Sequence, residues 1–341
     1  MVEKIPATVV TGFLGAGKTS LIRHLLENAE GRRIALIVNE FGDLGVDGEI
    51  LKGCGIEACA DDDIVELANG CICCTVADDF LPTMAALLDR DDPPDHIVIE
   101  TSGLALPKPL VKAFNWPDVR TRVTVDGVIA VLDGPAVRDG LFAANPDAVD
   151  AQRQADDNLD HESPLHELYE DQVSCADLLI LNKCDQLSDA ERDGLTAGLN
   201  GKRVVGATHG RIDARVLLGL GAAAEDDLDA RPSHHDGDDD HDHDDFDSFV
   251  VDVPEVAAPA DLIARLEAAA ASLPILRVKG FLPIAGKDMR LLVQGVGQRF
   301  QHYYDRPWRD GEARAGRLVV IGPRDLDQAA VRAALAPGSR D

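Results

Sequence analysis

The residues with the clearest capacity for chemistry form the stretch GFLGAGKT, Gly12 to Thr19. It follows an apolar run, Ile5 to Val10, and precedes SLIRHLLENA, so strand, glycine-rich loop and helix come in the order of a phosphate-binding loop. In such a loop the backbone N–H groups point at phosphate oxygens, Lys18 reaches the β- and γ-phosphates, and the Thr19 hydroxyl binds Mg²⁺. The candidate nucleotide-binding residues here are Gly12, Phe13, Leu14, Gly15, Ala16, Gly17, Lys18, Thr19 and Ser20.

A second polar stretch, NKCD from Asn182 to Asp185, follows the apolar run Leu178 to Leu181. The Asp185 carboxylate can accept hydrogen bonds from both N1–H and the 2-amino group of guanine, a donor pair that adenine lacks. Asn182 is expected to brace neighbouring loops, and the Lys183 stem is expected to lie over the base. GTP is therefore the predicted nucleotide. Two residues after the next strand are expected to close on the base from the other side, Thr208 and His209.

Two further residues are candidates for the reaction itself. Glu100 ends the stretch DHIVIE and is the acidic residue expected beside Mg²⁺ or its waters. Gly103 follows three residues later, and its N–H is expected to sense the γ-phosphate and to move on hydrolysis. Together with Lys18 and Thr19 they form the predicted catalytic set. No water-positioning glutamine is evident, so slow intrinsic hydrolysis is expected, with a partner or a metal completing the site.

The cluster GCICC, which contains Cys71, Cys73 and Cys74, points to a metal other than magnesium. Three thiols within four residues suit a soft or borderline cation such as Zn²⁺ or Co²⁺. All three can bind one ion only if the chain turns there, and otherwise two thiols bind and other groups complete the shell. Small buried residues in a tight loop, or a redox pair, are the alternatives. A second loop around Glu40 is expected to contribute to the same metal site.

The elements that must position these residues alternate along the chain between apolar strands and helices. Strands are predicted at 5–10, 32–40, 95–100, 125–134, 178–181 and near 202–210, with helices such as FLPTMAALLDR between them. This alternation predicts an α/β fold, a P-loop NTPase with a doubly wound, mostly parallel sheet. Ligands in such a sheet bind at the carboxyl ends of the strands, where both polar stretches fall.

Composition divides the chain into three parts. Residues 1–225 form the predicted P-loop GTPase domain. Residues 226–247 are rich in Asp, His and Gly and are predicted to be a disordered linker, with weak binding of divalent metal by its histidines as an alternative reading. Residues 248–341 combine alternating strands with two helices, which predicts a smaller α+β C-terminal domain with an antiparallel sheet.

Charge and hydropathy narrow the partners. A net charge of −28 argues against a nucleic-acid partner, because phosphate backbones require surfaces rich in Lys and Arg. No apolar stretch is long enough to span a bilayer and the N-terminus is not typical of a signal peptide, so a cytoplasmic protein without a membrane partner is expected. In that compartment the seven cysteines are expected to be thiols.

Five stretches in this order, TGFLGAGKTSL, VNEFGD, ELANGCICC, IVIETSG and NKCD, resemble the CobW family of metal-handling P-loop GTPases. The stretches LRVKGFLPI, VQGV and DRPW are similar to that family's C-terminal domain, so the likeness covers nearly the whole chain. The resemblance implies a GTPase metallochaperone that carries a metal on Cys71, Cys73 and Cys74 and releases it to a client when GTP is hydrolysed.

The insert LDHESPLHELYEDQ resembles the cobalamin-biosynthesis branch of the family. That branch implies Co²⁺ as the metal and cobaltochelatase as the client. Thiolate sites generally hold Zn²⁺ more tightly than Co²⁺, so a zinc chaperone of the same family is an alternative. A regulatory GTPase whose cysteines are structural is another, and the oligomeric state stays open, with a homodimer among the options.

Overall fold

The computed structural model describes residues 4–29, 31–38, 64–66, 80–105, 107–114, 116–154, 164–199, 202–218, 246–308 and 314–336. The chain divides into two compact units, Val2–Leu217 and Leu218–Asp341. Each unit has its own sheet and its own buried core. Because residues 219–245 lie outside the described part, the predicted linker and its boundaries stay predictions. The first strand of the second unit begins at Phe246, two residues before the predicted start of the C-terminal domain.

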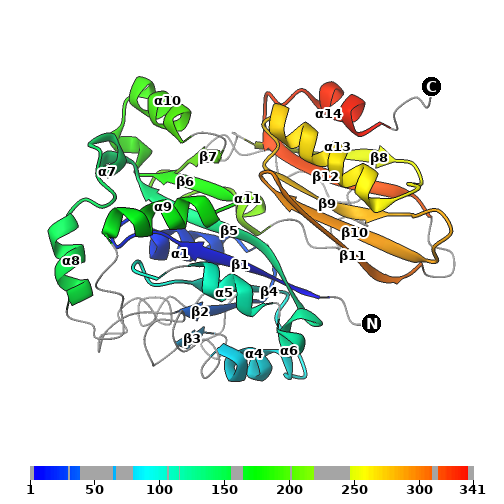
Figure 1. Cartoon of the computed structure of the whole chain (residues 1–341), viewed down its shortest axis with the longest axis horizontal. Coiled ribbons are helices and arrows are strands. Elements are labelled where there is room, and N and C mark those ends of the chain that lie inside the picture. Colours follow the sequence, from blue (N-terminus) through cyan, green and yellow to red (C-terminus); the bar gives the residue numbers. More distant parts are fainter. Residues whose placement is uncertain are drawn as a thin grey trace. The chain divides into compact units, whose positions relative to one another are not determined.

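The N-terminal unit is built on a seven-stranded sheet in the order β3-β2-β4-β1-β5-β6-β7, whose pairs are all parallel (Figure 1). Its strands are β1 (Ile5–Thr11), β2 (Ile34–Val38), β3 (Ile64–Glu66), β4 (His96–Glu100), β5 (Val123–Asp133), β6 (Leu178–Asn182) and β7 (Arg203–Gly206). The central strands β2, β4, β5 and β6 are mostly apolar and every residue in them is buried, as is typical of parallel strands covered by helices. The doubly wound parallel sheet predicted from the sequence is confirmed.

Helices connect the strands of this sheet. They are α1 (Lys18–Glu27), α4 (Leu81–Leu88), α5 (Pro107–Ala113), α6 (Pro117–Arg120), α7 (Gly134–Arg138), α8 (Pro146–Gln154), α9 (Leu165–Cys175), α10 (Asp189–Gly198) and α11 (Ala214–Leu218). Apolar residues of α4 and α5, such as Met84 and Leu110, share one core cluster with alternate strand residues such as Val9 and Ile99. Parallel pairing with crossover helices brings the carboxyl ends of β1, β4, β5 and β6 to one edge of the sheet.

The C-terminal unit is a five-stranded antiparallel sheet in the order β11-β10-β9-β12-β8. Its strands are β8 (Phe246–Val253), β9 (Arg277–Leu282), β10 (Met289–Val296), β11 (Arg299–Pro307) and β12 (Gly316–Pro323), and its helices are α13 (Pro259–Ser272) and α14 (Gln328–Leu335). Alternate strand residues, including Val278, Val293 and Val320, pack with Leu266 of α13 and Val331 of α14 in one core. The predicted separate α+β domain is confirmed.

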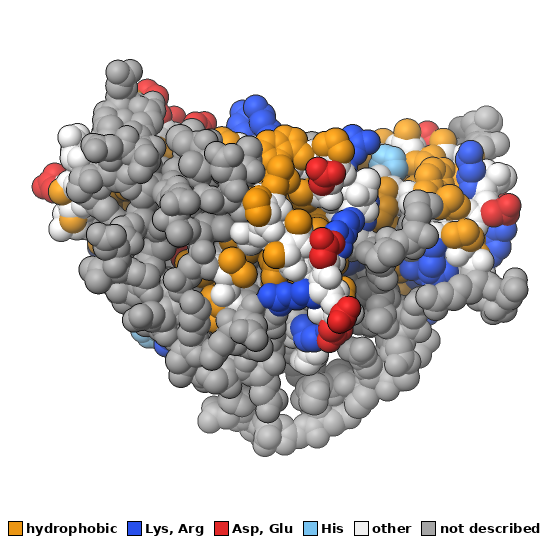
Figure 2. All heavy atoms as spheres, turned by 90° about the horizontal axis from the view of Figure 1, so that it is seen from below, with side chains coloured by type: hydrophobic (Ala, Val, Ile, Leu, Met, Phe, Trp, Pro, Cys, Tyr) orange, Lys and Arg blue, Asp and Glu red, His pale blue; other side chains and the backbone are white. Residues whose placement is uncertain are grey.

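Two features of the structure bear on nucleic acids and membranes as partners: the distribution of charged side chains and the length and polarity of the helices. On the face shown in Figure 2, Lys and Arg side chains are scattered among acidic and hydrophobic ones. Within the described ranges, the helices are too short or too polar to cross a bilayer.

Candidate functional site

The loop between β1 and α1 has the backbone of a phosphate cradle. Gly12, Gly15 and Gly17 have φ angles of 136°, 77° and 102°, a region that residues with a Cβ rarely adopt. A Cβ on Gly12 would stand 2.3 Å from the carbonyl oxygen of Val131 in β5, so this glycine is also required for close packing. A Cβ on Gly15 would meet nothing within 4 Å, so the loop is open at that point. The sequence thus folds here into consecutive turns, the kind of backbone whose N–H groups can converge on a phosphate.

The side chains of this loop divide between its interior and solvent. Lys18 opens α1, is 8% exposed, and its Nζ donates hydrogen bonds to the carbonyl oxygens of Gly12 at 2.8 Å and Phe13 at 3.4 Å. Its ammonium therefore lies within the loop. Phe13 and Ala16 are buried, whereas Leu14 is 50% exposed. Ser20 is exposed in the first turn of α1.

Glu100 and Gly103 approach this loop from the neighbouring strand β4. The Thr19 hydroxyl donates to Oε1 of Glu100 at 3.5 Å, and Glu100 is 4% exposed. A hydroxyl and a buried carboxylate at this separation are hard oxygen donors of the kind Mg²⁺ takes. A Cβ on Gly103 would stand 2.7 Å from the backbone nitrogen of Leu14, so the segment after β4 lies directly against the loop. The residues present thus fit a nucleoside triphosphate with Mg²⁺.

Asn182 joins the phosphate loop to the loop after β7, where two of the predicted base-binding residues lie. Its Nδ2 donates to the carbonyl oxygen of Ala16 at 2.9 Å, and its Oδ1 accepts from the N–H of Gly210 at 3.0 Å. Asn182 is 2% exposed, so both contacts are shielded from water. These two hydrogen bonds match the bracing expected from the sequence. They tie together three segments that are more than 20 residues apart in the chain.

The remaining predicted base-binding residues belong to two loops, one after β6 and one after β7, which the hydrogen bond from Cys184 N–H to the carbonyl oxygen of Ala207 joins at 3.0 Å. Lys183 has a φ of 60° and Asp185 is exposed in the short 3₁₀ turn Cys184–Gln186. Thr208 and His209 precede Gly210, and His209 has a φ of 54°. Left-handed backbone at non-glycine residues stores strain that is typical of functional loops. Such strain occurs at Lys183 and His209, one in each of the two loops that are predicted to contact guanine.

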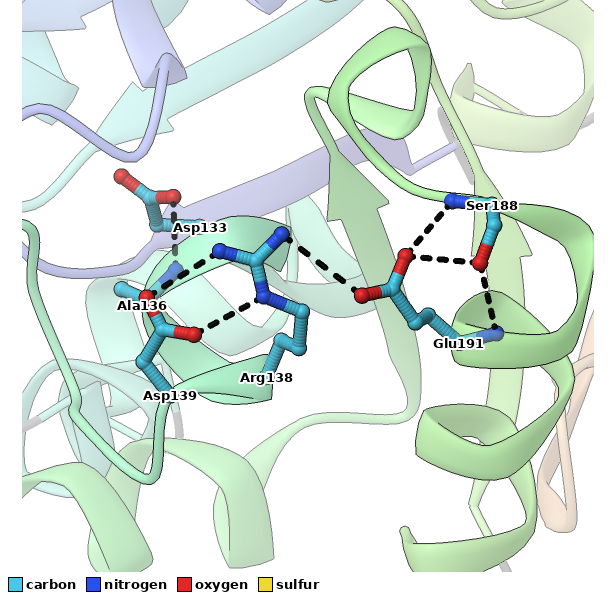
Figure 3. A network of polar contacts seen from close by, with 6 residues as sticks. All are labelled: Asp133, Ala136, Arg138, Asp139, Ser188 and Glu191. Atoms are coloured by element: carbon cyan, nitrogen blue, oxygen red, sulfur yellow. Dashed lines mark hydrogen bonds and ion pairs between the residues drawn. The ribbon is translucent and has the colours of Figure 1, made fainter.

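Hydrogen bonds and ion pairs cap the two helices α7 and α10, which follow β5 and β6, and link them to one another (Figure 3). Asp133 ends β5 and caps α7, since its Oδ1 accepts from the N–H of Ala136 at 3.2 Å. From α7, Arg138 pairs with Asp139 and reaches Oε1 of Glu191 on α10 at 3.7 Å. Glu191 in turn accepts from the hydroxyl and the backbone N–H of Ser188 in a capping box. The contacts with Ser188 hold the pKa of Glu191 below its ordinary value.

Sequence reasoning missed two residues of this site. Asp133 accepts a hydrogen bond from Lys183 Nζ at 2.6 Å, and it is 2% exposed. The sequence carried a signal for Asp133, because it ends a largely apolar strand, as Glu100 and Asn182 end theirs. In the structure Asp133 pairs in register with Asn182. Gln172 on α9 donates to the carbonyl oxygens of Gly103 and Ala105. A glutamine within a helix gives no comparable signal in one sequence.

Cys184, the third residue of the NKCD stretch, is packed as a structural residue. Its Sγ donates to the carbonyl oxygen of Leu181 at 3.0 Å, and it packs against the core of the N-terminal unit. Burial raises the pKa of the Cys184 thiol. This is the setting of a small packed residue.

The predicted metal-binding residues Cys71, Cys73, Cys74 and Glu40 lie outside the described residues. Among the described ranges, no group of three or more His, Cys, Asp or Glu side chains is arranged to hold a metal ion. The role of Cys71, Cys73, Cys74 and Glu40 as metal ligands therefore stays a prediction.

Comparison with known proteins identifies both units. Residues 6–203 match the family described as CobW/HypB/UreG, nucleotide-binding domain, and residues 246–337 match the cobalamin synthesis protein cobW C-terminal domain. The chain is 59% identical to a protein named zinc chaperone CobW from a Sinorhizobium species, over 97% of this chain and 96% of the relative. It is 57% identical to the protein of that name from Pseudomonas aeruginosa, over 96% of this chain and 90% of the relative.

A more distant relative is named zinc chaperone YjiA from Escherichia coli, at 34% identity over 97% of this chain and 98% of the relative. The crystal structure of Zn(II)-bound YjiA GTPase from E. coli aligns with 98% of each chain at 27% identity, with a TM-score of 0.41. The family matches cover most of both units and the phosphate loop lies within the first of them. The chain is therefore a P-loop protein of the CobW/HypB/UreG family that carries the CobW-type C-terminal domain.

Proposed function

We propose that this chain is a GTP-hydrolysing metallochaperone, which carries a divalent metal on Cys71, Cys73 and Cys74 and hands it to a client protein. The observation that carries the nucleotide part is the Asn182 side chain, which bonds the phosphate loop at 2.9 Å and the loop after β7 at 3.0 Å. A nucleotide lying across that bridge would contact the phosphate loop with one end and the residues around Asp185 with the other. Membership of the family and the names of its relatives support the metal part.

The residues of the phosphate loop and of the segment after β4 would each act on a different part of the nucleotide. Lys18 Nζ, held by the carbonyl oxygens of Gly12 and Phe13, would transfer its hydrogen bonds to the β- and γ-phosphates. Thr19 and Glu100 would hold Mg²⁺, which neutralises charge that develops on the phosphates. Gly103, packed against the loop, would contact the γ-phosphate and report its loss.

Zinc is the better supported cargo. Relatives 57–59% identical to this chain are named zinc chaperones. Thiolate sites of fixed geometry also bind Zn²⁺ more tightly than Co²⁺. Cobalt, with cobaltochelatase as the client, is the second candidate, because the insert LDHESPLHELYEDQ resembles the cobalamin-biosynthesis branch. Competition between the two metals at buffered free concentrations distinguishes them, with preferential loading of Zn²⁺ expected.

Nucleotide and metal must affect one another for delivery to be timed. We expect the GTP form to assemble the loops around Glu40 and Cys71 into the metal site, and hydrolysis to dismantle it. By reciprocity, metal then tightens GTP binding by the same factor by which GTP tightens metal binding. A regulatory GTPase with structural cysteines would show no such coupling.

The direct test of the proposed activity is hydrolysis of GTP and ATP by the full chain, with and without Zn²⁺. We expect the chain to hydrolyse GTP in a reaction that depends on Lys18, and to hydrolyse little ATP. Replacement of Cys71, Cys73 and Cys74 by Ser should abolish loading of a zinc-requiring client while GTP binding persists. Client loading that survives the triple replacement would favour the regulatory GTPase instead.

A further inference from the structure

Helix α9 presents one face to the segment that follows β4 and to the phosphate loop. Leu165, Leu168 and Tyr169 of this helix pack in a small apolar cluster with Phe13 and with residues just after Gly103. The ring centroids of Phe13 and Tyr169 are 6.2 Å apart, and burial raises the pKa of the Tyr169 hydroxyl. A single helix thus contacts both of the segments that the proposed function places around the γ-phosphate.

Gln172 lies one helical turn beyond Tyr169 on this face and is 1% exposed. Its Nε2 donates to the carbonyl oxygen of Gly103 at 3.0 Å and to that of Ala105 at 3.2 Å. An amide nitrogen has two hydrogens, so both are used on the segment after β4. A buried polar side chain that makes two such bonds fixes the backbone it contacts, because leaving those carbonyls unpaired would cost free energy.

The segment that Gln172 holds is pressed against the phosphate loop from the other side. A Cβ on Gly103 would stand 2.7 Å from the nitrogen of Leu14 and 3.1 Å from the carbonyl carbon of Phe13. A small displacement of Gly103 would therefore move its N–H relative to the loop. Gly103 is confined between the loop on one side and the Gln172 amide on the other.

We propose that Gln172 is a positioning residue that holds Gly103 in the orientation required to sense the γ-phosphate, and so sets the preference for GTP over GDP. This inference rests on the proposed function, since it assigns Gln172 a role at the same nucleotide site. It adds α9 to the elements that respond to the nucleotide. When Gly103 moves on hydrolysis, the two hydrogen bonds to Gln172 transmit that movement to the helix.

A purely structural role for Gln172 makes a different prediction. Loss of two buried hydrogen bonds would then lower thermal stability and weaken the binding of all nucleotides equally. If Gln172 instead positions Gly103, its substitution weakens binding of the triphosphate selectively, because GDP has no γ-phosphate for Gly103 to contact. The ratio of GDP to GTP dissociation constants separates the two roles.

The experiment measures dissociation constants of the full chain for fluorescent mant-GTPγS and mant-GDP in Mg²⁺ buffer. Gln172→Met keeps the length of the side chain and removes both donors. We expect its preference for the triphosphate to fall about tenfold, the effect of one good buried hydrogen bond, with GDP affinity unchanged. Gln172→Asn, which keeps the amide but draws it back by one methylene, provides a milder second variant with the same expected direction should Gln172→Met fail to fold.

Ser174→Ala is the matched control, because Ser174 lies on the same helix and its exposed hydroxyl bonds only to the carbonyl oxygen of Asp171 among the contacts described. It should leave the preference unchanged. An unchanged preference in both Gln172 variants, or an equal loss for both nucleotides, overturns this inference while the proposed function stands. Failure of the wild-type chain to bind guanine nucleotides at all overturns both.

Discussion

The Lys183 ammonium lies 2.6 Å from Oδ2 of Asp133, a carboxylate that is 2% exposed at the end of the neighbouring strand β5. The other oxygen of Asp133 caps α7. One buried carboxylate therefore fixes both the helix after β5 and the side chain expected to lie over the guanine base. Lys183 has a left-handed backbone, so its main chain and its side-chain tip are both constrained.

Asp133→Asn should weaken binding of guanine nucleotides about tenfold, or about 1.4 kcal/mol. Asn is as good a helix cap as Asp, so α7 should persist while the charge that holds Lys183 is lost. Isothermal titration with GDP measures the change. Asp139→Asn, which removes the exposed partner of Arg138 on the same helix, is the control and should have no effect. GDP affinity equal to that of wild type in Asp133→Asn would show that Lys183 is not positioned by this pair.

Asp185→Asn should shift base preference from guanine to xanthine. An Asp carboxylate accepts from the N1–H and the 2-amino group of guanine, whereas an Asn amide can donate to the 2-oxo group of xanthine and still accept from N1–H. Loss of a charged acceptor should weaken GDP by roughly 1.5–3 kcal/mol. Parallel titrations with GDP and XDP test this. A variant that loses both nucleotides equally would place the base elsewhere.

Gly17→Ala and Gly15→Ala form a matched pair in the phosphate loop. Both positions have positive φ, so each substitution should cost about 1–2 kcal/mol in backbone strain. A Cβ on Gly17 would also stand 2.2 Å from Nδ2 of Asn182, whereas one on Gly15 would contact nothing within 4 Å. Gly17→Ala should therefore displace Asn182 and be the more damaging variant by thermal unfolding and by GDP binding. Equal effects would show that the Asn182 bridge contributes nothing beyond loop strain.

The acid stability of the fold should depend on Glu191. Its hydrogen bond from the Ser188 hydroxyl, more than any other contact, lowers its pKa from the ordinary value of 4.5. A carboxyl with a lowered folded pKa stabilises the protein above pH 4.5, and this contribution is lost as the pH falls below that value. Glu191→Gln should thus melt below wild type at neutral pH, with a difference that shrinks in acid. The exposed Asp193 on the same helix provides the control, Asp193→Asn. A constant difference at every pH would exclude this role for Glu191.

Much of this site was predictable because its residues follow strong local patterns. GFLGAGKT between an apolar run and a helix, and NKCD after another apolar run, each specify a backbone conformation within a few residues. The parallel sheet then brings Glu100 and Asn182 to the same edge, as the alternation of strands and helices predicts. Thr19 and Glu100 meet although 81 residues separate them.

Contacts that depend on the packing of a helix could not be read in the same way. Gln172 reaches Gly103 only because α9 lies over the segment after β4, and a glutamine in a polar helix is ordinarily exposed. The helices α7 and α10 also went unpredicted: α7 has only five residues, whereas α10 carried a readable signal in the capping box of Ser188 and Glu191. Each begins with a local cap, in which Asp133 bonds Ala136 and Ser188 bonds Glu191 three residues further on.

Timed delivery requires that nucleotide binding and metal binding be coupled, and one titration measures that coupling. The measurement is the Zn²⁺ dissociation constant of the full chain bound to GTPγS and Mg²⁺, bound to GDP and Mg²⁺, and free of nucleotide, with Cys71, Cys73 and Cys74 replaced by Ser as the control. Visible absorption of Co²⁺ thiolate complexes reports the same site independently. We expect tighter Zn²⁺ binding with GTPγS, by about 5- to 150-fold, and loss of that difference in the triple variant. Equal zinc affinity in all three nucleotide states would contradict it.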